Sequence, residues 1–228
     1  MLVSDLAGTL IRPEPPVARQ YLDAANNLVD DGALPSYETV ESRFHTAFAH
    51  IRAPGDKLRY GSTDTEGLWF WKRVISCVFP TVEDDVLELL VNRLYVNFEQ
   101  SGAWEIFPEA ESVLQRLKRS GWNLVVLTNW DSRAPRLIKN LELFPYFDEV
   151  IVSSRVGVEK PDTEIFELVR ERMEFELDDP VMIGNHVDID LVTPDRMGWD
   201  TVLFTPESDD GWAVEADTWS EIYDLLLT

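Results

Sequence analysis

Four short polar segments in this 228-residue chain contain side chains that can hold ions and anions. Asp5 offers a carboxylate, Thr128-Asn129 a hydroxyl and an amide, and Lys160 an ammonium group. The fourth segment, 184–190, has the sequence GNHVDID and offers an amide and two carboxylates. A hydroxyl beside free backbone N–H groups can hold an oxyanion, and an ammonium near a helix N-terminus favours an anion. Amide and carboxylate oxygens suit a metal ion or water.

Short apolar runs rich in β-branched residues place these segments on a predicted sheet. The runs are residues 1–6, 124–127, 150–152, 181–183 and 201–204. Such runs are typical of strands buried on both faces of a parallel sheet. Between them, apolar residues recur with a period near 3.6, as expected for crossover helices; examples are 110–117, 138–141 and 165–173. Ligands of such sheets bind beyond the carboxyl ends of the strands, where the polar segments fall.

Residues 16–103 differ in kind from the rest of the chain. They show helical patterns at 21–29, 40–51, 68–79 and 86–98, with no convincing strand. Pro-rich and Gly-containing stretches at 12–16 and 101–103 bound this region and suit linkers or hinges. We therefore predict an α/β fold: a Rossmann-like parallel-sheet core (1–15 and 104–228) with an inserted helical-bundle cap domain (16–103).

Taken together, the four segments resemble the motifs of the haloacid dehalogenase-like hydrolase superfamily, in the branch with a helical cap after the first motif (subfamily I). The resemblance covers the whole chain and keeps the order and spacing of the motifs. It implies a hydrolase in which Asp5 is the covalent nucleophile, Thr128 binds the transferred group and Lys160 balances negative charge. We add Thr9 to the candidate catalytic residues, and Gly8 and Asn129, at the strand ends, to those that contact the substrate. Arg43, from the basic set of the predicted cap, is a further candidate for substrate contact.

Two positions depart from the family pattern. The general acid/base, normally an Asp two residues after the nucleophile, is replaced by Ala7, and the usual metal-binding Asp is replaced by Asn185. Losing a positioned acid/base costs about 10²–10⁴-fold in rate. A magnesium site would then use Asp5, the Ala7 carbonyl, Asn185 and water held by Asp190 or its neighbour Asp188, and would bind Mg²⁺ weakly because an amide brings no charge.

The departures leave several functions open. The first is hydrolysis of a small phosphorylated metabolite, with low activity. A second is a metal-independent 2-haloacid dehalogenase type of reaction, and a third is a catalytically impaired protein that binds a ligand or partner. A phosphonoacetaldehyde hydrolase shares the Asp-x-Ala-Gly-Thr pattern but needs a cap lysine, for which only Lys57 and Lys72 are available.

Some of these residues also have plainer explanations. Asn185 suits a turn after a strand as well as it suits a metal. His186 could replace the missing base, although a solvent-facing loop histidine is the simpler interpretation. The basic set in the predicted cap could receive an anionic substrate or simply form a solvated helix face; it comprises Arg43, His45, His50, Arg52, Lys57 and Arg59.

Composition limits the partners. The formal net charge of −22 repels nucleic-acid phosphates and anionic membranes, so neither is an expected partner. The resemblance instead implies a small anionic substrate. The N-terminus enters the first strand without a signal-like apolar core, and no apolar run reaches membrane-spanning length, so we expect a cytoplasmic protein, monomeric or homodimeric. The only cysteine, Cys77, lies in an apolar run and is predicted to be buried.

Overall fold

A computed structural model describes residues 1–29, 31–51, 63–173, 180–206 and 212–227. The chain divides into two compact units, each described by itself below. The first, called the core unit, contains Met1–Arg12 and Ile106–Thr228, and the second, called the helical unit, contains Pro13–Glu105. Arg52, Lys57 and Arg59 lie outside the described residues.

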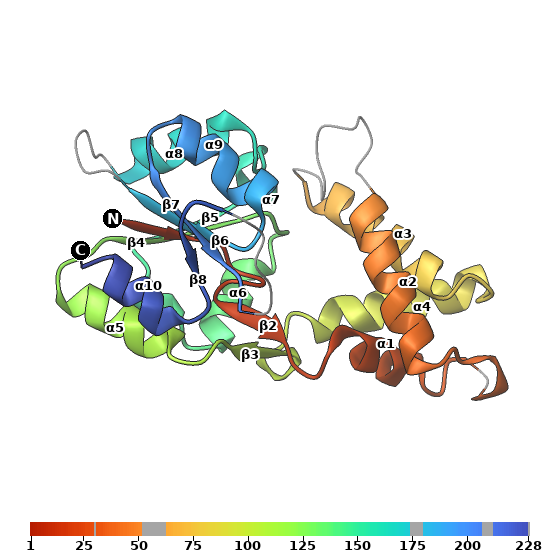
Figure 1. Cartoon of the computed structure of the whole chain (residues 1–228). Helices are drawn as coiled ribbons and strands as arrows, with labels where there is room; N and C mark the ends of the chain where they lie inside the picture. Colours follow the sequence, from red (N-terminus) through yellow and green to blue (C-terminus); the bar gives the residue numbers. More distant parts are fainter. Residues whose placement is uncertain (30, 52–62, 174–179, 207–211, 228) are drawn as a thin grey trace. The chain divides into compact units, whose positions relative to one another are not determined.

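The core unit is built on a six-stranded parallel sheet with the strand order β5-β4-β1-β6-β7-β8 (Figure 1). The strands are β1 (Leu2–Ser4), β4 (Leu124–Thr128), β5 (Glu149–Val152), β6 (Val181–Gly184), β7 (Asp200–Phe204) and β8 (Glu215–Ala216). The predicted α/β class with a parallel sheet is confirmed. Two short strands outside this sheet, β2 (Ile11–Pro13) and β3 (Trp104–Ile106), pair with each other.

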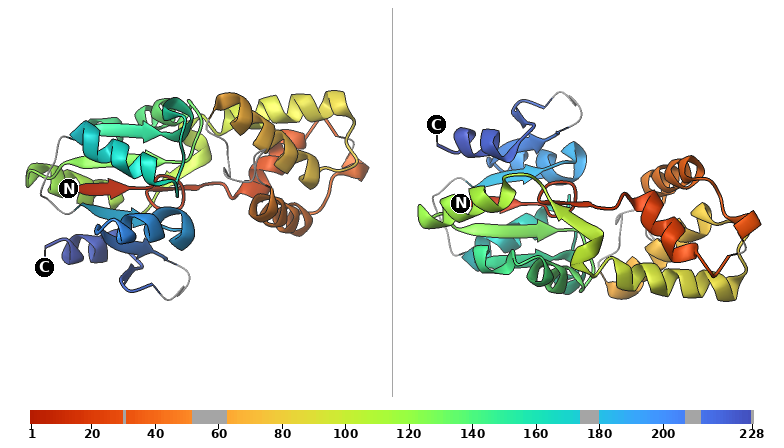
Figure 2. Two further views of the ribbon diagram at one scale, coloured as in Figure 1. Left: turned by 90° about the horizontal axis from the view of Figure 1, so that it is seen from above. Right: turned by 90° about the horizontal axis from the view of Figure 1, so that it is seen from below.

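Helices cover both faces of this sheet. Seen from above in Figure 2, α8 (Thr163–Met173) and α9 (Val192–Arg196) lie over the strands, and seen from below, α5 (Ala110–Arg119) and α10 (Trp219–Leu225) do so. Two shorter helices, α6 (Ala134–Asn140) and α7 (Ser153–Val156), flank β5 in the sequence. Because both faces are covered, the strands read as continuous apolar runs, which is why they could be recognised in the sequence.

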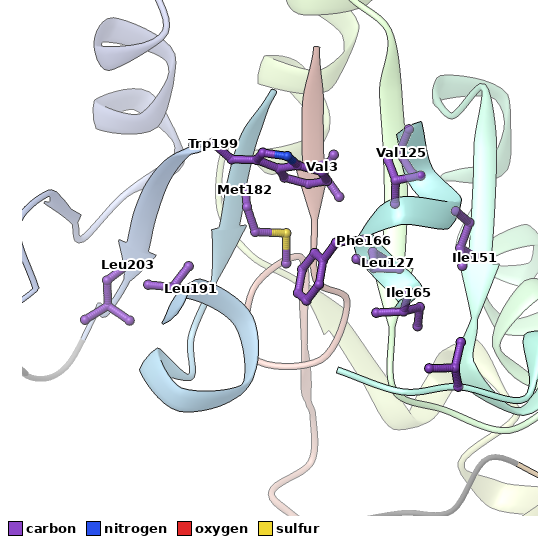
Figure 3. Packing of buried hydrophobic residues seen from close by; sticks show 12 residues of the cluster. Val3, Val125, Leu127, Ile151, Ile165, Phe166, Met182, Leu191, Trp199 and Leu203 are labelled. Atoms are coloured by element: carbon purple, nitrogen blue, oxygen red, sulfur yellow. The ribbon is translucent and has the colours of Figure 1, made fainter. Parts of the chain in front are cut away.

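The strand register fixes both the core and the place of the site. Val3 pairs with Val125 on one side and with Met182 on the other, and all three pack in the apolar cluster under α8 (Figure 3). Burying such side chains stabilises a fold by about 1.5–3 kcal/mol each. Two residues after Val3 comes Asp5, whose N–H donates to the Ile183 carbonyl at 2.9 Å. Asp5 therefore emerges at the carboxyl end of β1, in the middle of the sheet.

The helical unit contains α1 (Val17–Ala25), α2 (Tyr37–His50), α3 (Asp64–Val78) and α4 (Asp84–Asn97). Ser36 and Thr63 cap α2 and α3, since their hydroxyls accept the Thr39 and Glu66 N–H groups. Apolar side chains from the helices meet in one cluster that includes Tyr21. Single 3₁₀ turns lie at Asp31–Ala33 and Ser101–Ala103 here, and at Phe144–Tyr146 in the core unit. The predicted helical patterns at 40–51, 68–79 and 86–98 are thus confirmed, whereas the pattern at 21–29 is helical only as far as Ala25, where α1 ends.

The prediction for Cys77 is wrong, because its side chain is exposed. In α3 the buried face carries Val74, Ile75 and Val78. A helix turns about 100° per residue, so position 77 points away from that face although its neighbours in the sequence are apolar. Among the described residues, no helix is both long and apolar enough to cross a membrane.

Candidate active site

The turn after β1 brings Asp5 to the edge of the sheet and then folds the chain back. The N–H groups of Leu10 and Ile11 both donate to the Leu6 carbonyl, and Gly8 N–H donates to the Ile11 carbonyl at 2.7 Å. Gly8 has a φ of +89°, a conformation that costs little only without a Cβ. A Cβ at this position would also lie 2.3 Å from Asn185 Nδ2. Glycine therefore permits both the turn and the close approach of Asn185.

Lys160 lies at the centre of a buried charge cluster, defined here as Asp5, Lys160 and Asp190. Its Nζ is 2.8 Å from Asp5 Oδ1 and 2.7 Å from Asp190 Oδ1. Lys160 is only 1% exposed, Asp5 8% and Asp190 2%. Since 155 residues separate Lys160 from Asp5 in the sequence, only the parallel sheet brings them together. The prediction that these motifs share one edge of the sheet agrees with this geometry.

Asp190 reaches Lys160 because the chain after β6 turns tightly. A π-helical turn, Val187–Leu191, follows the strand, and its Asp190 N–H donates to the His186 carbonyl at 2.7 Å. The Asp190 side chain packs directly over Gly184, where a Cβ would lie 2.3 Å from that of Asp190. Its Oδ2 accepts the His186 N–H at 3.0 Å. Both carboxylate oxygens of Asp190 thus meet N–H donors, and one of them holds the ammonium of Lys160.

Burial and the neighbouring charges set the protonation of the cluster. Burial raises the pKa of Asp5; Lys160 opposes this rise, and the nearby Asp190 charge adds to it. For Lys160, burial disfavours the ammonium, but the carboxylates of Asp190 and Asp5 outweigh burial and raise its pKa. Lys160 is therefore a fixed cation near neutral pH. The Asp5 carboxylate is less stabilised than an exposed one, a condition common for reactive groups.

Thr128 and Asn129 end β4 beside this cluster. Thr128 is buried at the last position of the strand. The Asn129 side chain does not point toward open solvent; its Oδ1 accepts the Lys160 N–H and its Nδ2 donates to the Lys160 carbonyl, both at 2.8 Å. The residue predicted to contact the substrate is thus bonded to the backbone of the lysine.

The remaining predicted residues lie in varied places. Thr9 is buried, and its hydroxyl has no hydrogen-bond partner among the described residues, while its carbonyl accepts from Trp219 Nε1 at 3.0 Å. Ala7 lies in the turn after Asp5 and forms a bridge with Ile11. Arg43 belongs to the helical unit, where it donates to the Val78 carbonyl at 3.0 Å and so helps to close the end of α3. The side chains of His186 and Asp188 are exposed.

One feature of the loop after β4 was not predicted from the sequence. Asp131 and Arg133 form a buried bidentate pair, with Arg133 Nε 2.7 Å from Asp131 Oδ1 and Nη2 2.6 Å from Oδ2. The Arg133 backbone N–H also donates to the same carboxylate at 3.1 Å. Charged residues two apart in a loop have no periodic signature, so only their burial reveals the pair. It rigidifies the segment directly after Asn129.

Few of the described side chains are arranged to ligate a cation. Among the described residues, no group of three or more His, Cys, Asp and Glu is arranged to hold a metal ion. However, Asn185 Oδ1 is buried and accepts no hydrogen bond from any described residue. Buried amide oxygens are seldom left without a partner. Together with the Asp5 carboxylate, this oxygen fits a hard cation such as Mg²⁺ at a site with one carboxylate.

Comparison with known proteins points to one family. A chain from Xenopus laevis named haloacid dehalogenase-like hydrolase domain-containing protein 3 is 26% identical over 213 residues, which cover 91% of this chain and 85% of that protein. Ribulose-1,5-bisphosphate 5-phosphatase from Halopiger xanaduensis is 28% identical over 113 residues, 49% of this chain and 47% of that enzyme.

A crystal structure of YfnB from Bacillus subtilis, described as a putative haloacid dehalogenase-like hydrolase bound to magnesium, has the same fold. Its TM-score is 0.74 at 20% identity, with 100% of this chain and 98% of that chain covered. The family model described as "haloacid dehalogenase-like hydrolase" matches residues 1–193. With its parallel sheet and the carboxylate and lysine at the edge of that sheet, the chain belongs to the haloacid dehalogenase-like hydrolases.

Proposed function

We propose that this protein hydrolyses phosphate monoesters of small metabolites, with Asp5 as the nucleophile. The observation that carries the proposal is the buried cluster in which Lys160 holds Asp5 Oδ1 at 2.8 Å. A carboxylate fixed at the end of a central strand, beside a permanent cation, is suited to attack an electrophilic phosphorus. The similarity of 49% of the chain to a ribulose-1,5-bisphosphate 5-phosphatase supports the same substrate class.

The proposed reaction has two steps. Asp5 Oδ2 attacks phosphorus, an Asp5–phosphate bond forms, and the ester P–O bond breaks; the leaving alkoxide takes a proton from water. Water then attacks the phosphorus of the acyl phosphate, which releases inorganic phosphate and returns the Asp5 carboxylate, while the proton goes to solvent. Lys160 keeps Asp5 in place and offsets the charge of the phosphoryl group, and Thr128 is assigned to bind a phosphoryl oxygen.

Mg²⁺ would be held by the Asp5 carboxylate and the Asn185 amide oxygen, with the Ala7 carbonyl as a third donor. When bound, it supplies positive charge that offsets the phosphate. The cluster itself carries two carboxylates against one ammonium, so a phosphate dianion needs this added charge. We therefore expect activity to depend on Mg²⁺, with weak metal binding because Asn185 is neutral.

Ala7 determines how fast the reaction runs. Without a general acid/base at this position, proton transfer depends on water, and turnover should be about 10²–10⁴-fold below that of relatives with an Asp there. Esters with good leaving groups, which need no proton, should react best. A nitrophenyl phosphate should thus be hydrolysed faster than an alkyl phosphate.

The test is hydrolysis of a panel of sugar phosphates, nitrophenyl phosphate and 2-chloropropionate, with Mg²⁺ and with a chelator. The native protein is compared with Asp5→Asn and with the double variant Ala7→Asp/Asn185→Asp. Mg²⁺-dependent phosphate release that is absent in Asp5→Asn and higher in the double variant supports the proposal. Chloride release without metal indicates carbon-centred hydrolysis instead, and no turnover by either the native or the double variant contradicts an enzymatic role.

A further inference from the structure

Among the described residues, the side chain of Asn129 forms its hydrogen bonds with the backbone of one residue, Lys160. Its amide bonds both backbone polar groups of Lys160, accepting from the N–H and donating to the carbonyl, each at 2.8 Å. Two such bonds fix the position and the orientation of a peptide segment, as a paired strand would do. The Lys160 side chain leaves this fixed backbone and ends between Asp5 and Asp190.

The backbone on both sides of Asn129 is itself fixed. It directly follows the buried residue Thr128, the last of β4. On its other side, the N–H of Trp130 donates to Ser153 Oγ and the Trp130 carbonyl accepts from the same hydroxyl, both at 3.0 Å. The amide of Asn129 is therefore a rigid link from the central sheet to the lysine segment.

A lysine needs such support. Its four-carbon stem has several rotatable bonds, and fixing it costs up to about 2 kcal/mol in conformational entropy. In this cluster the ammonium must stay between two carboxylates, where a displacement of about 1 Å can cost 10²-fold in rate. Thr193 also holds this segment, since its Oγ1 donates to the Pro161 carbonyl at 2.7 Å.

We propose that Asn129 is a positioning residue for the reaction: it acts through Lys160, whose backbone it clamps, and not by binding the substrate. The inference rests on the proposed function for its catalytic consequence, but the clamp itself is independent of turnover. It replaces the expectation that Asn129 contacts the substrate.

The first test needs no activity. The chain has five lysines, at 57, 72, 118, 139 and 160, so labelling with trinitrobenzenesulfonate can be followed for each lysine by peptide mass spectrometry. In the native protein the exposed Lys72 and Lys139 should react while Lys160, 1% exposed, stays protected. Asn129→Ala should increase the labelling rate of Lys160 about tenfold or more, and leave the exposed lysines unchanged. Asn129→Asp keeps the acceptor for the Lys160 N–H and should give an intermediate rate.

Thr193→Val is the matched control, because it removes the side-chain bond to the neighbouring Pro161 and leaves both Asn129 bonds in place. Its Lys160 labelling should remain at the native rate. If Thr193→Val exposes Lys160 as much as Asn129→Ala does, the clamp is not specific to Asn129 and the inference fails. If Lys160 stays protected in both Asn129 variants, the inference also fails.

The second test separates positioning from substrate binding, with nitrophenyl phosphate and Mg²⁺. In Asn129→Ala, kcat should fall about 10–100-fold while KM stays within about threefold. A large rise in KM with little change in kcat would assign Asn129 to the substrate and overturn the inference. If the native protein shows no turnover, the proposed function fails, while the labelling result still decides the clamp.

Discussion

At the scale of single residues, the charge cluster has more negative than positive charge. Lys160 faces two carboxylates, and all three side chains are nearly inaccessible to water. Buried ions lose hydration, which their mutual attraction only partly offsets. Lys160 remains charged because both carboxylates stabilise its ammonium group. Burial and the Asp190 charge disfavour the ionised form of Asp5, so its pKa is raised. The arrangement is suited to reactivity more than to stability.

Asp5→Asn should therefore abolish turnover and yet increase stability at neutral pH. Lys160 keeps its bond to Asp190, and the cost of the ionised Asp5 is removed. Because the pKa of Asp5 is higher in the folded than in the unfolded protein, protonation of Asp5 stabilises the native state at low pH. This stabilisation is lost as the pH rises through the folded pKa. The advantage of Asp5→Asn should thus be largest near pH 7 and shrink toward the ordinary Asp pKa of about 3.9. Urea unfolding across this pH range measures it.

Lys160→Met provides the contrasting control. It leaves two facing carboxylates in a buried site and should lower the free energy of unfolding by about 3–5 kcal/mol. If Asp5→Asn destabilised the protein as much as Lys160→Met does, Asp5 would be a structural partner of the lysine, and the account of its raised pKa would be wrong.

At the scale of elements, two tight turns bring the cluster together. Gly184 ends β6 and lets the π-helical turn fold back so that Asp190 packs over its Cα. Gly8, in the turn after β1, likewise leaves room for the side chain of Asn185 to pack closely against it. π-helical turns are rare and often occur at functional sites. The reactive groups are thus held by backbone geometry at strand ends, and small changes there should affect them.

Gly184→Ala tests this argument. The added Cβ would lie 2.3 Å from the Asp190 Cβ, so Asp190 must shift and its bond to Lys160 must lengthen. We expect a loss of about 1–3 kcal/mol in unfolding free energy and reduced turnover. Gly102→Ala is the control, because a Cβ there meets nothing within 4 Å and its stability should change by less than about 0.5 kcal/mol. Equal stabilities of the two variants would show that Asp190 is not fixed by the turn.

The elements themselves could be predicted from the sequence, and the contacts between side chains could not. The apolar runs at β1 and β5 identify buried strands, and the carboxyl-end rule for parallel sheets then brings Asp5 and, beyond the short α7, Lys160 to one edge. The choice of partner depends on distances of a few tenths of an ångström. For that reason the sequence could place Asn129 and Asp190 at this edge, but their hydrogen bonds to Lys160 are seen only in the structure.

At the scale of the whole molecule, 42 acidic residues against 20 basic ones give a net charge of −22. Like charges on one surface repel, which destabilises the compact state. Salt screens this repulsion, since the Debye length falls from about 14 Å at 0.05 M to about 3 Å at 1 M. The same charge opposes the approach of an anionic substrate, so the fixed Lys160 has to act locally.

The thermal midpoint should therefore rise steadily between about 0.05 M and 1 M NaCl. Differential scanning calorimetry measures this, with sucrose at matched osmolality as the control for effects other than screening. A midpoint that does not change with NaCl would show that charge repulsion contributes little to the stability of this protein.

The central claim is that Asp5 attacks phosphorus, and trapping the covalent intermediate tests it most directly. The protein is mixed with nitrophenyl phosphate and Mg²⁺, quenched in acid and reduced with borohydride, which converts an acyl phosphate to an alcohol. Peptide mass spectrometry should then find homoserine at position 5 in the native protein and unmodified residues in a sample without substrate. Phosphate release with Asp5 recovered unmodified, or with the reduced residue at another carboxylate, would contradict the proposed mechanism.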